Sequence, residues 1–342
     1  MSRSEITVDL RALARNVGRL RAVAAPAEVW AVVKADAYGH GAADVAPAAV
    51  RAGARGLCVV TAREGAALRQ LVPRGTRILV MGPTDDADLE LVRASDLEVA
   101  VHEPDAGAGL RRHLKIDTGM GRFGMRPEAA LAASRDGVVG VMSHLATADE
   151  PDDSFAREQV AQFGDVADRF EGAVRHVANS AAALRLPEAR FDAVRTGIAV
   201  YGLSPFEGDP ADDGLEPVLS WRSHVAQTKT LGPGESTGYG RRFVAERPTR
   251  IGLVPVGYAD GFRRGLTGTE VLVDGTRRRV LGTISMDSLA VELEDEPAGA
   301  PVTLLGDGIR AEEHARVLGT INYEITTGIR ADGDRTDRCV RD

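Results

Sequence analysis

The sequence contains very little lysine, although basic residues are common. Lys34, Lys115 and Lys229 are the three lysines among 42 basic residues, so the other 39 are arginines. Arginine keeps its proton in proteins and forms no Schiff base, whereas lysine can act as an amine nucleophile. Each of the three lysines is therefore a candidate for chemistry that arginine cannot perform.

Several other features are missing. The two cysteines, Cys58 and Cys339, lie far apart and belong to no CxxC or Cys/His cluster, which argues against a disulfide framework and a zinc site. No run approaches the roughly 18 apolar residues of a membrane span, and no signal-peptide core is present. A formal net charge of −8 offers no basic field for nucleic acid or an anionic membrane. We therefore expect a cytoplasmic enzyme without a metal, a nucleic-acid partner or a membrane anchor.

Up to about residue 200, short β-branched runs alternate with Ala-, Arg- and Leu-rich segments of helical spacing. Eight such runs predict parallel βα units, and their number predicts an α/β fold with a closed (β/α)8 TIM-like barrel. The connection Glu103–Arg112 is short and Gly-rich, so we expect no full helix there. The predicted strands are Val29–Val33, Leu57–Thr61, Arg77–Met81, Leu97–Val101, His113–Asp117, Val138–Ser143, Val174–Ala178 and Ala193–Val200.

The pattern changes after an acidic linker, Gly208–Gly214. Alternating runs follow, separated by turn signals such as Asp274-Gly275, and only Ala311–Thr320 has helical spacing. We therefore predict a barrel domain of residues 1–212 and a mostly antiparallel β domain of residues 213–342. The tail after Ile329 is charged and has no proline or aromatic residue, so we expect it to be frayed or disordered.

Polar side chains follow several predicted barrel strands, at the end where such barrels place their active sites. Lys34 follows the first strand, where it either extends from the strand end to solvent or is shielded from water, which would lower its pKa and favour an amine nucleophile. The scarcity of lysine in this sequence favours the second interpretation. Taken singly, the other residues also fit a surface charge, a buried histidine or a helix cap, but their convergence on one rim favours an active site. They are Lys115, Arg122, His144, Asn179, Ser180 and Arg195, and the segment of Arg195 continues into Gly197 and Ile198.

Several segments, in order, resemble the alanine racemase family, whose members are fold-type III pyridoxal-phosphate enzymes. The segments are Ala31–Gly41, Asp117–Arg122, Arg195–Leu203 and Gly257–Gly261, and the resemblance extends over nearly the whole chain. The family fold, a barrel followed by a β domain, agrees with the pattern above. The resemblance implies pyridoxal 5'-phosphate as cofactor, a small amino-acid substrate, a homodimer with shared active sites, and interconversion of L- and D-alanine for peptidoglycan.

The resemblance also implies roles for individual residues. Lys34 would hold the cofactor as an internal aldimine and act as a base on one face of the substrate Cα. Tyr239, from the second subunit, would be the base on the other face. Arg195 would face the pyridine nitrogen, and His144 would lie against the ring and link towards Tyr239.

The remaining implied contacts hold the phosphate or shape the substrate pocket. Arg122 would bond near the phenolic oxygen of the cofactor and to the substrate carboxylate. The phosphate ligands would be Tyr38, Ser180, the backbone of Gly197 and Ile198, and Tyr323. The pocket and its entrance would be formed by Tyr258, Met286 and Asp287.

Two positions leave alternatives open. Lys115 lies seven residues before Arg122 and is either a carbamate that orients this arginine, as the resemblance implies, or a plain lysine in an ion pair. Thr283 occupies a place where the family often has an arginine. Lys229 lies in a predicted strand, has no chemical role that we can argue, and is expected at the surface.

Other functions remain as alternatives. A broad-specificity or serine-preferring racemase would share the same motifs, because one pocket residue can shift size preference. A pyridoxal-phosphate carrier would keep the barrel and the lysine but would lack the β domain, so residues 216–329 argue against it. A decarboxylase on the same barrel is disfavoured by Arg195, because such enzymes more often place a carboxylate at the ring nitrogen.

Overall fold

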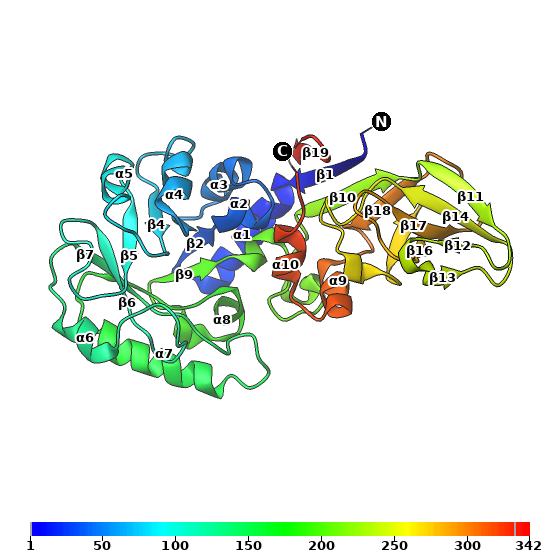
Figure 1. The fold of residues 1–342 in the computed structure, drawn as a ribbon. Helices are drawn as coiled ribbons and strands as arrows, with labels where there is room; N and C mark the ends of the chain where they lie inside the picture. The colour runs from blue at the N-terminus through cyan, green and yellow to red at the C-terminus, as the bar shows by residue number, and fades with distance from the viewer. Residues whose placement is uncertain (1, 332) are drawn as a thin grey trace. The chain divides into compact units, whose positions relative to one another are not determined.

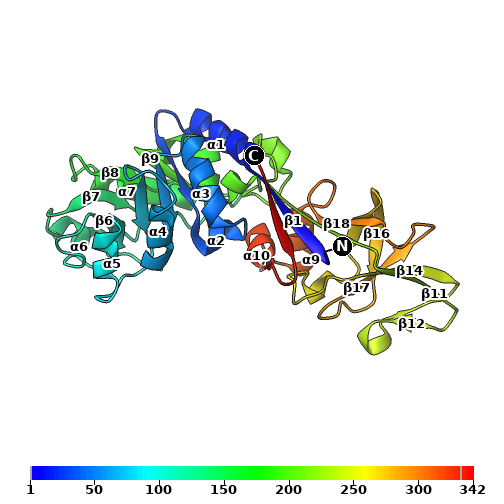
Figure 2. The ribbon, with the colours of Figure 1, turned by 90° about the horizontal axis from the view of Figure 1, so that it is seen from above.

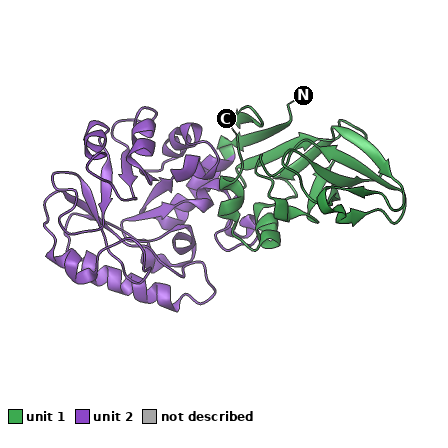
Figure 3. Cartoon of the chain, viewed as in Figure 1, with its two compact units in different colours: residues 1–11, 217–342 green, residues 12–216 purple. Residues whose placement is uncertain are grey.

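The computed structural model describes residues 2–331 and 333–342 and divides into two compact units (Figure 3). One unit is Ala12–Glu216, and the other combines the N-terminal segment up to Arg11 with Pro217–Asp342. The N-terminal segment thus clusters with the C-terminal part, a feature that the predicted domains 1–212 and 213–342 do not contain. In the described part of the chain, no helix has both the length and the apolar character needed to cross a membrane.

Eight parallel strands form the sheet of the first unit, as the alternating pattern predicted. Their order, β8-β7-β6-β5-β4-β3-β2-β9, places the last strand beside the first. Backbone hydrogen bonds from Arg195 to Ala178 (2.9 Å) and from Asp192 to Arg175 (3.0 Å) link the two remaining ends and close the barrel. The strands are β2 (Glu28–Val32), β3 (Gly56–Val59), β4 (Arg77–Val80), β5 (Glu98–Val101), β6 (Arg112–Lys115), β7 (Val138–Met142), β8 (Val174–His176) and β9 (Ala193–Thr196).

Amphipathic helices lie on the outside of this sheet, as Figure 1 shows for α4 and α7. In α1, for example, Leu13, Val17 and Leu20 repeat at helical spacing and are all buried, which explains why this segment packs as a helix. The helices of the unit are α1 (Leu10–Ala24), α2 (Lys34–Tyr38), α3 (Ala42–Arg51), α4 (Ala62–Arg69), α5 (Leu89–Ala94), α6 (Pro127–Ala132), α7 (Ser154–Ala167) and α8 (Ser180–Arg185).

The connection from β5 to β6 has no helix, which confirms the prediction for this segment. A buried arginine takes the helix's place. The guanidinium of Arg112 donates hydrogen bonds of 2.8–2.9 Å to the carbonyl oxygens of Pro104, Ala106, Ser134 and Asp136. It therefore fixes two loops whose carbonyls would otherwise be left unsatisfied.

The second unit is built on a nine-stranded sheet of order β11-β14-β17-β16-β15-β18-β10-β1-β19 and is mostly antiparallel, as predicted. Asp274 and Gly275 both have positive φ and form the predicted hairpin between β15 and β16. The strands are β1 (Ser4–Asp9), β10 (Leu219–His224), β11 (Gln227–Leu231), β14 (Thr249–Val254), β15 (Glu270–Val273), β16 (Thr276–Leu281), β17 (Leu289–Leu293), β18 (Pro301–Leu305) and β19 (Asp337–Arg341). A separate ribbon pairs β12 (Ser236–Thr237) with β13 (Phe243–Val244), and the helices are α9 (Ala311–Leu318) and α10 (Asn322–Thr327).

The expectation of a frayed tail is wrong, because residues 337–341 form β19. This strand pairs in parallel with β1, from Glu5 opposite Asp337 to Asp9 opposite Arg341 (Figure 2). Since β1 pairs with β10 on its other side, the tail covers an edge that would otherwise expose unpaired backbone groups. The stabilisation comes from the backbone, so the charged side chains of the tail do not reveal it.

Arg112 provides a stability test of the first unit. We expect Arg112→Met to lower the free energy of unfolding by about 3 kcal/mol or more, because buried carbonyls lose a charged donor. The matched change Arg111→Met removes a half-exposed partner of Asp96 and should cost less than about 1 kcal/mol. Urea unfolding measures both values, and equal effects would show that Arg112 does not organise these loops.

Candidate active site

The predicted rim of polar side chains is present at the carboxyl end of the barrel. Lys34 begins α2 just after β2, and Lys115 is the last residue of β6. His144 follows β7, Ser180 begins α8 after β8, and Arg195 lies near the end of β9. Because all these strands are parallel, their carboxyl ends meet at one side of the barrel and bring the side chains together.

The segment after Lys34 has an unusual backbone. Four consecutive residues, Ala35–Tyr38, have φ between 50° and 56°, so α2 is a left-handed turn. Left-handed helical geometry costs about 1–2 kcal/mol per residue when a Cβ is present. Such strain persists only where the surroundings enforce it, and it is often found at functional sites.

Glu64, at the start of α4, is one of the groups that enforce this turn. Its Oε1 accepts a hydrogen bond from the backbone N of Ala35 (2.9 Å). Its Oε2 accepts from the backbone N of Val60 (2.9 Å) and of Thr61 (3.0 Å). One carboxylate thus joins the lysine turn to the end of the neighbouring strand β3 and fixes the position where Lys34 leaves the backbone.

Both rim lysines hold their protons less tightly than ordinary lysines. Burial, followed by the charge of Arg122, lowers the pKa of Lys34, and Glu64 partly opposes this effect. Burial, followed by the charges of Arg195, Arg122 and Lys34, lowers the pKa of Lys115 to about 8. A lysine with a lowered pKa has more of its neutral amine form near neutral pH, and this form is the nucleophile and base.

Arg195 is the most buried cation of the rim and makes only donor contacts to neutral groups. Its Nη1 lies 2.8 Å from Nδ1 of His176 and donates to the carbonyl of the same residue at 2.7 Å. Its Nη2 donates to the carbonyl of Ser143 (2.7 Å) and lies 3.4 Å from Nδ1 of His144. Burial lowers the pKa of Arg195 only to about 10, so it stays a cation at neutral pH.

His144 is neutral at physiological pH. Burial, with the charges of Arg195, Arg122 and Lys115, lowers its pKa to about 3. A neutral imidazole whose Nδ1 faces an arginine donor carries its proton on Nε2, which leaves that nitrogen free to donate a hydrogen bond on its other side.

A small cradle of donors lies where β8 and β9 end. The Oγ of Ser180 accepts from the backbone N of Gly197 (3.0 Å) and of Ala199 (3.3 Å). A Cβ on Gly197 would lie 2.5 Å from the hydroxyl of Tyr38, so glycine is needed for this close approach. The short 3₁₀ helix Ile198–Tyr201 begins here and leaves further backbone N–H groups at its start. Hydroxyl and amide donors arranged in this way suit a phosphate group.

Two other predicted site residues of the barrel, Asn179 and Arg122, lie at a helix cap and in an exposed loop. The Oδ1 of Asn179 accepts from the backbone N of Ala182 (3.0 Å), so this side chain caps α8. Arg122 is exposed in the loop after β6, and its charge lowers the pKa values of Lys34, Lys115 and His144.

The other unit brings together a second group of predicted residues. The side chain of Tyr239 is 71% exposed and lies on a tight turn with positive φ at Gly238 and Gly240. The hydroxyl of Thr283 donates to the carbonyl of Tyr239 (2.8 Å), so the threonine that stands in place of an arginine has a structural contact. This contact ties the tyrosine to the segment that leads to Met286 and Asp287.

Backbone contacts place Tyr258 beside the same segment. The N–H of Tyr258 donates to Ser285 (3.1 Å), and that of Ala259 donates to Met286 (3.0 Å). Met286 and Tyr258 are 52% and 40% exposed, whereas Asp287 is held by an ion pair of 2.6 Å with Arg335. Tyr323 lies in α10 of this unit and is partly buried. Lys229 is exposed on β11, as expected.

A barrel with a lysine after its first strand, hydroxyl and amide groups gathered at its last strands and a following β domain defines a class, the fold-type III pyridoxal-phosphate enzymes. Comparisons with known proteins narrow this class. Family models described as the N-terminal and C-terminal domains of alanine racemase match residues 8–205 and 218–338. The chain belongs to the alanine racemase family and is a racemase of the isomerase class.

Individual relatives agree with this assignment. The chain is 41% identical to an alanine racemase of Streptomyces coelicolor, with 98% of this chain and 95% of the relative covered. An alanine racemase structure from Streptomyces lavendulae has a TM-score of 0.91 at 40% identity and covers 100% of this chain and 98% of its own. The structure from Bartonella henselae, with covalently bound pyridoxal phosphate, has a TM-score of 0.90 at 28% identity, with 99% of both chains covered.

The residues present fit the cofactor of this family. Lys34 supplies an amine with a lowered pKa, and Tyr38, Ser180 and Gly197 supply the cradle that a Cβ would fill. Arg195 supplies a donor that stays protonated at neutral pH. The sequence motifs did not point to Glu64, whose only signal is the capping-box spacing from Thr61, because its contact with Ala35 depends on the packing of neighbouring strands.

The three lysines allow the rim electrostatics to be measured residue by residue. In cofactor-free protein labelled with [13C]lysine, we expect the Cε resonance of Lys115 to titrate near pH 8, with the amine charged below that pH and neutral above it. The Lys34 midpoint should lie below the ordinary value of 10.5. Lysine-to-methionine variants assign the resonances.

A pair of arginine variants tests the cause. Arg122→Gln should raise both midpoints, because it removes a cation that lowers both pKa values. Arg126→Gln, in the same connection, is the control and should leave them unchanged. A Lys115 midpoint near 10.5 in the unmodified chain would contradict this description of the rim.

Proposed function

We propose that this chain interconverts L- and D-alanine with Lys34 and Tyr239 as two bases on opposite faces of the substrate Cα. The observation that carries the proposal is the placement of Lys34, which leaves a left-handed turn at the end of a barrel strand with its pKa lowered. Free L-serine and broader substrates are the weaker alternative, because the relatives reported above are named as alanine racemases.

Pyridoxal phosphate, when bound, supplies an electron-withdrawing ring that makes the Cα proton of an amino acid acidic enough for a protein base. We propose that Lys34 bonds to it covalently and that the donor cradle holds its phosphate. The barrel residues proposed to hold the phosphate are Tyr38, Ser180, Gly197 and Ile198, with Asn179 capping the helix that presents Ser180. The family resemblance adds Tyr323 as a further phosphate ligand.

Lys34 acts as a base once its amine is neutral. Its burial and the nearby Arg122 favour the neutral form, so the proton that it takes from one face is also readily returned. Arg122 also binds the carboxylate of the substrate and sets its orientation at the rim. Arg122 can both lower the pKa of Lys34 and bind the substrate, because the bound carboxylate offsets the positive charge that Arg122 adds to the site.

Tyr239 serves the opposite face. A tyrosine has a reference pKa near 10, so it needs a neighbouring donor or cation to act near neutrality. We propose that His144, polarised by Arg195 at 3.4 Å, supplies this help through its second nitrogen. Tyr258, Met286 and Asp287 limit the size of the pocket and its entrance.

Arg195 faces the ring nitrogen of the cofactor in this proposal. As a permanent donor, it leaves that nitrogen an acceptor and disfavours its protonation. A carboxylate in this place would do the opposite, which is the reason a decarboxylase is not favoured. The arginine would therefore limit side reactions while one base removes the Cα proton and the other base delivers a proton to the opposite face.

Lys115 is proposed to carry a carbamate. The neutral amine attacks carbon dioxide, an N–C bond forms as one C=O π bond opens, and the nitrogen releases one proton to solvent. A pKa of about 8 supplies a fraction of the neutral amine near physiological pH. The resulting anion replaces a cation in a positively charged rim and orients Arg122. The alternative is an unmodified Lys115 beside Asp117, and the charge of Asp117 raises the pKa of this lysine.

We propose that the chain is a homodimer and that Tyr239 reaches the barrel of the partner subunit. The exposure of Tyr239, Tyr258 and Met286 supports a covering partner, because large apolar groups are costly in water. We also propose a cytoplasmic enzyme that supplies D-alanine for peptidoglycan. Two free cysteines, Cys58 and Cys339, fit a reducing compartment.

The activity is tested with purified enzyme and both candidate substrates. We expect conversion of L-alanine to D-alanine with a higher kcat/KM than conversion of L-serine. Lys34→Ala should lose the visible absorbance of lysine-bound cofactor and the activity, and Lys34→Arg, which keeps the charge, should lose both as well. No D-isomer from either amino acid, or a preference for serine, would contradict the proposed function.

Hybrid dimers test the shared site. Lys34→Ala and Tyr239→Phe chains should each be nearly inactive alone. Their co-expression should restore about a quarter of the wild-type rate, because random pairing gives about half hybrids and each hybrid has one intact site. If Tyr239 acted within its own subunit, no hybrid site would be intact and no activity would return.

A further inference from the structure

A chain of buried polar side chains crosses the interior of the barrel and ends at Arg195. The Oε2 of Glu98, at the start of β5, lies 2.9 Å from Nε2 of His113 on β6. Nδ1 of His113 lies 2.8 Å from Nε2 of His176 on β8, and Nδ1 of His176 lies 2.8 Å from Nη1 of Arg195 on β9. Barrel interiors of this kind are ordinarily filled by branched apolar residues, so this chain is a departure that needs a reason.

The ends of the chain determine where its protons lie. Arg195 has only donors, so Nδ1 of His176 must accept. Burial lowers the pKa of His176 well below its ordinary value, so the imidazole is neutral and carries its proton on Nε2. Nδ1 of His113 then accepts, and its Nε2–H donates to Glu98. Both imidazoles thus have one tautomer, and every hydrogen bond points from Arg195 towards Glu98.

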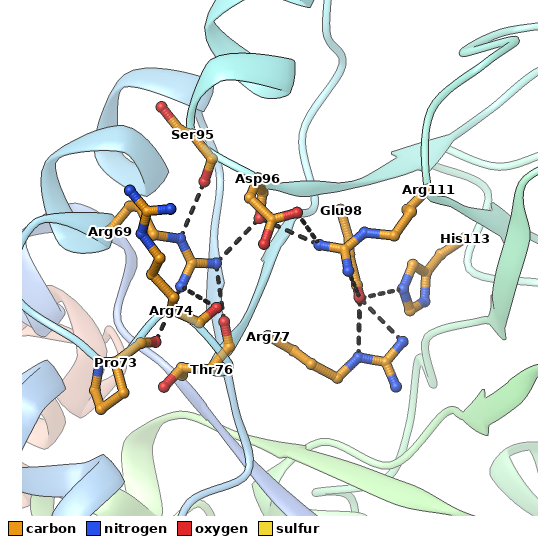
Figure 4. A network of polar contacts seen from close by, with 10 residues as sticks. All are labelled: Arg69, Pro73, Arg74, Thr76, Arg77, Ser95, Asp96, Glu98, Arg111 and His113. Carbon is orange, nitrogen blue, oxygen red and sulfur yellow. Dashed lines mark hydrogen bonds and ion pairs between the residues drawn. The ribbon is translucent and has the colours of Figure 1, made fainter.

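Glu98 is ionised and firmly held at the far end (Figure 4). Burial by itself would raise its pKa, but the hydrogen bond from His113 and the nearby Arg77 lower it to about 2. Nε of Arg77 donates to both carboxylate oxygens at 3.1 Å, and Arg111 lies 3.9 Å away. Glu98 is therefore a fixed negative charge joined to Arg195 through two neutral rings.

The strands make room for these rings by using glycine. A Cβ on Gly140, which faces His113 in the register of β6 and β7, would lie 2.1 Å from Nδ1 of that histidine. A Cβ on Gly56, opposite Trp30, would lie 2.9 Å from the indole. Trp30 packs against both imidazoles, with ring centroids 5.8 Å from His113 and 4.8 Å from His176. The packing around this hydrogen-bonded series therefore holds the two imidazoles in one arrangement.

Arg195 has unusual surroundings for a buried cation. Among the described residues, its hydrogen-bond partners are neutral imidazole nitrogens and backbone carbonyls, and none of them is a carboxylate. A buried charge is costly unless it is paired or well hydrogen-bonded. The chain to Glu98 supplies both an oriented acceptor and, through polarised hydrogen bonds, a remote negative charge.

We propose that Glu98, His113 and His176 form a relay of positioning residues that orients the guanidinium of Arg195 and keeps it a cationic donor towards the active site. The inference rests on the proposed function, in which Arg195 faces the ring nitrogen of the cofactor. It extends the functional part of the barrel from the rim to the start of β5, and it gives Glu98, which touches no reacting atom, a role in turnover.

The wild-type protein tests the relay without any activity measurement. In cofactor-free, 15N-labelled protein, two-bond 1H–15N correlations of His113 and His176 should each show a neutral ring protonated at Nε2. A ring protonated at Nδ1, or a charged ring, for either histidine would overturn the proposal, because the hydrogen bonds could not then run from Arg195 to Glu98.

Two variants break the relay at different points. Glu98→Gln keeps the shape and removes the charge, while Gly140→Ala substitutes no relay residue but displaces the ring of His113. Each should shift the side-chain 15N resonances of His176 and Arg195 in cofactor-free protein. In the holoenzyme each should lower kcat about tenfold with KM for L-alanine changed less than about twofold, since a charged hydrogen bond that orients a catalytic group is weakened.

Controls separate the relay from general damage to the barrel. Glu216→Gln changes an exposed carboxylate that pairs with Arg15 and is outside the relay, and Gly18→Ala adds a methyl group in open space. Both should leave the resonances and kcat unchanged. Wild-type values in Glu98→Gln would overturn the relay. If the wild type showed the predicted tautomers but no racemisation, the proposed function would fail and the hydrogen-bond chain would stand.

Discussion

The constraint on which this site depends is the meeting of cations at the carboxyl end of one barrel. Four cations gather there: Lys34, Lys115, Arg122 and Arg195. Each of them lowers the pKa of at least one titratable neighbour among the two lysines and His144. Like charges gathered away from water favour loss of a proton from the groups that can lose one. Arginine cannot lose its proton here, so His144 is neutral and the two lysines lose their protons more readily than ordinary lysines do. A phosphate and a carboxylate are the ligands that such a rim attracts.

The fold meets this constraint by fixing each charged group through its backbone or through neutral acceptors. Glu64 holds the strained turn that carries Lys34, and the cradle at Ser180 joins two strand ends. Arg195 is held by carbonyls and by an imidazole whose far side leads to Glu98. The carboxylates Glu64 and Glu98 therefore act at a distance from the rim centre, where they orient cations without neutralising them directly.

Continuous apolar runs explain why the barrel strands could be predicted from the sequence to within a few residues, since strands buried on both faces have a strong signal. The strands β1 and β19 and the short helix α10 were not predicted, because the pairing of β19 with β1 and the packing of a short helix depend on backbone partners rather than on composition. The rim residues could be found from their positions after strands. The roles of Glu98, His113 and Gly140 could not be predicted, because these residues come into contact only when neighbouring strands are placed in register. The presence of a histidine and a lysine in one buried strand, β6, was the one sequence signal that pointed to them.

The central claim is that Lys34, whose pKa is lowered by burial and by Arg122, serves one face of the substrate Cα while Tyr239 serves the other. Deuterium exchange in heavy water tests it most directly. With Tyr239→Phe holoenzyme, we predict that one enantiomer of alanine gains deuterium at Cα with its configuration kept, through Lys34 alone, while the other enantiomer does not exchange. Exchange of both enantiomers at similar rates, or of neither, would contradict the account.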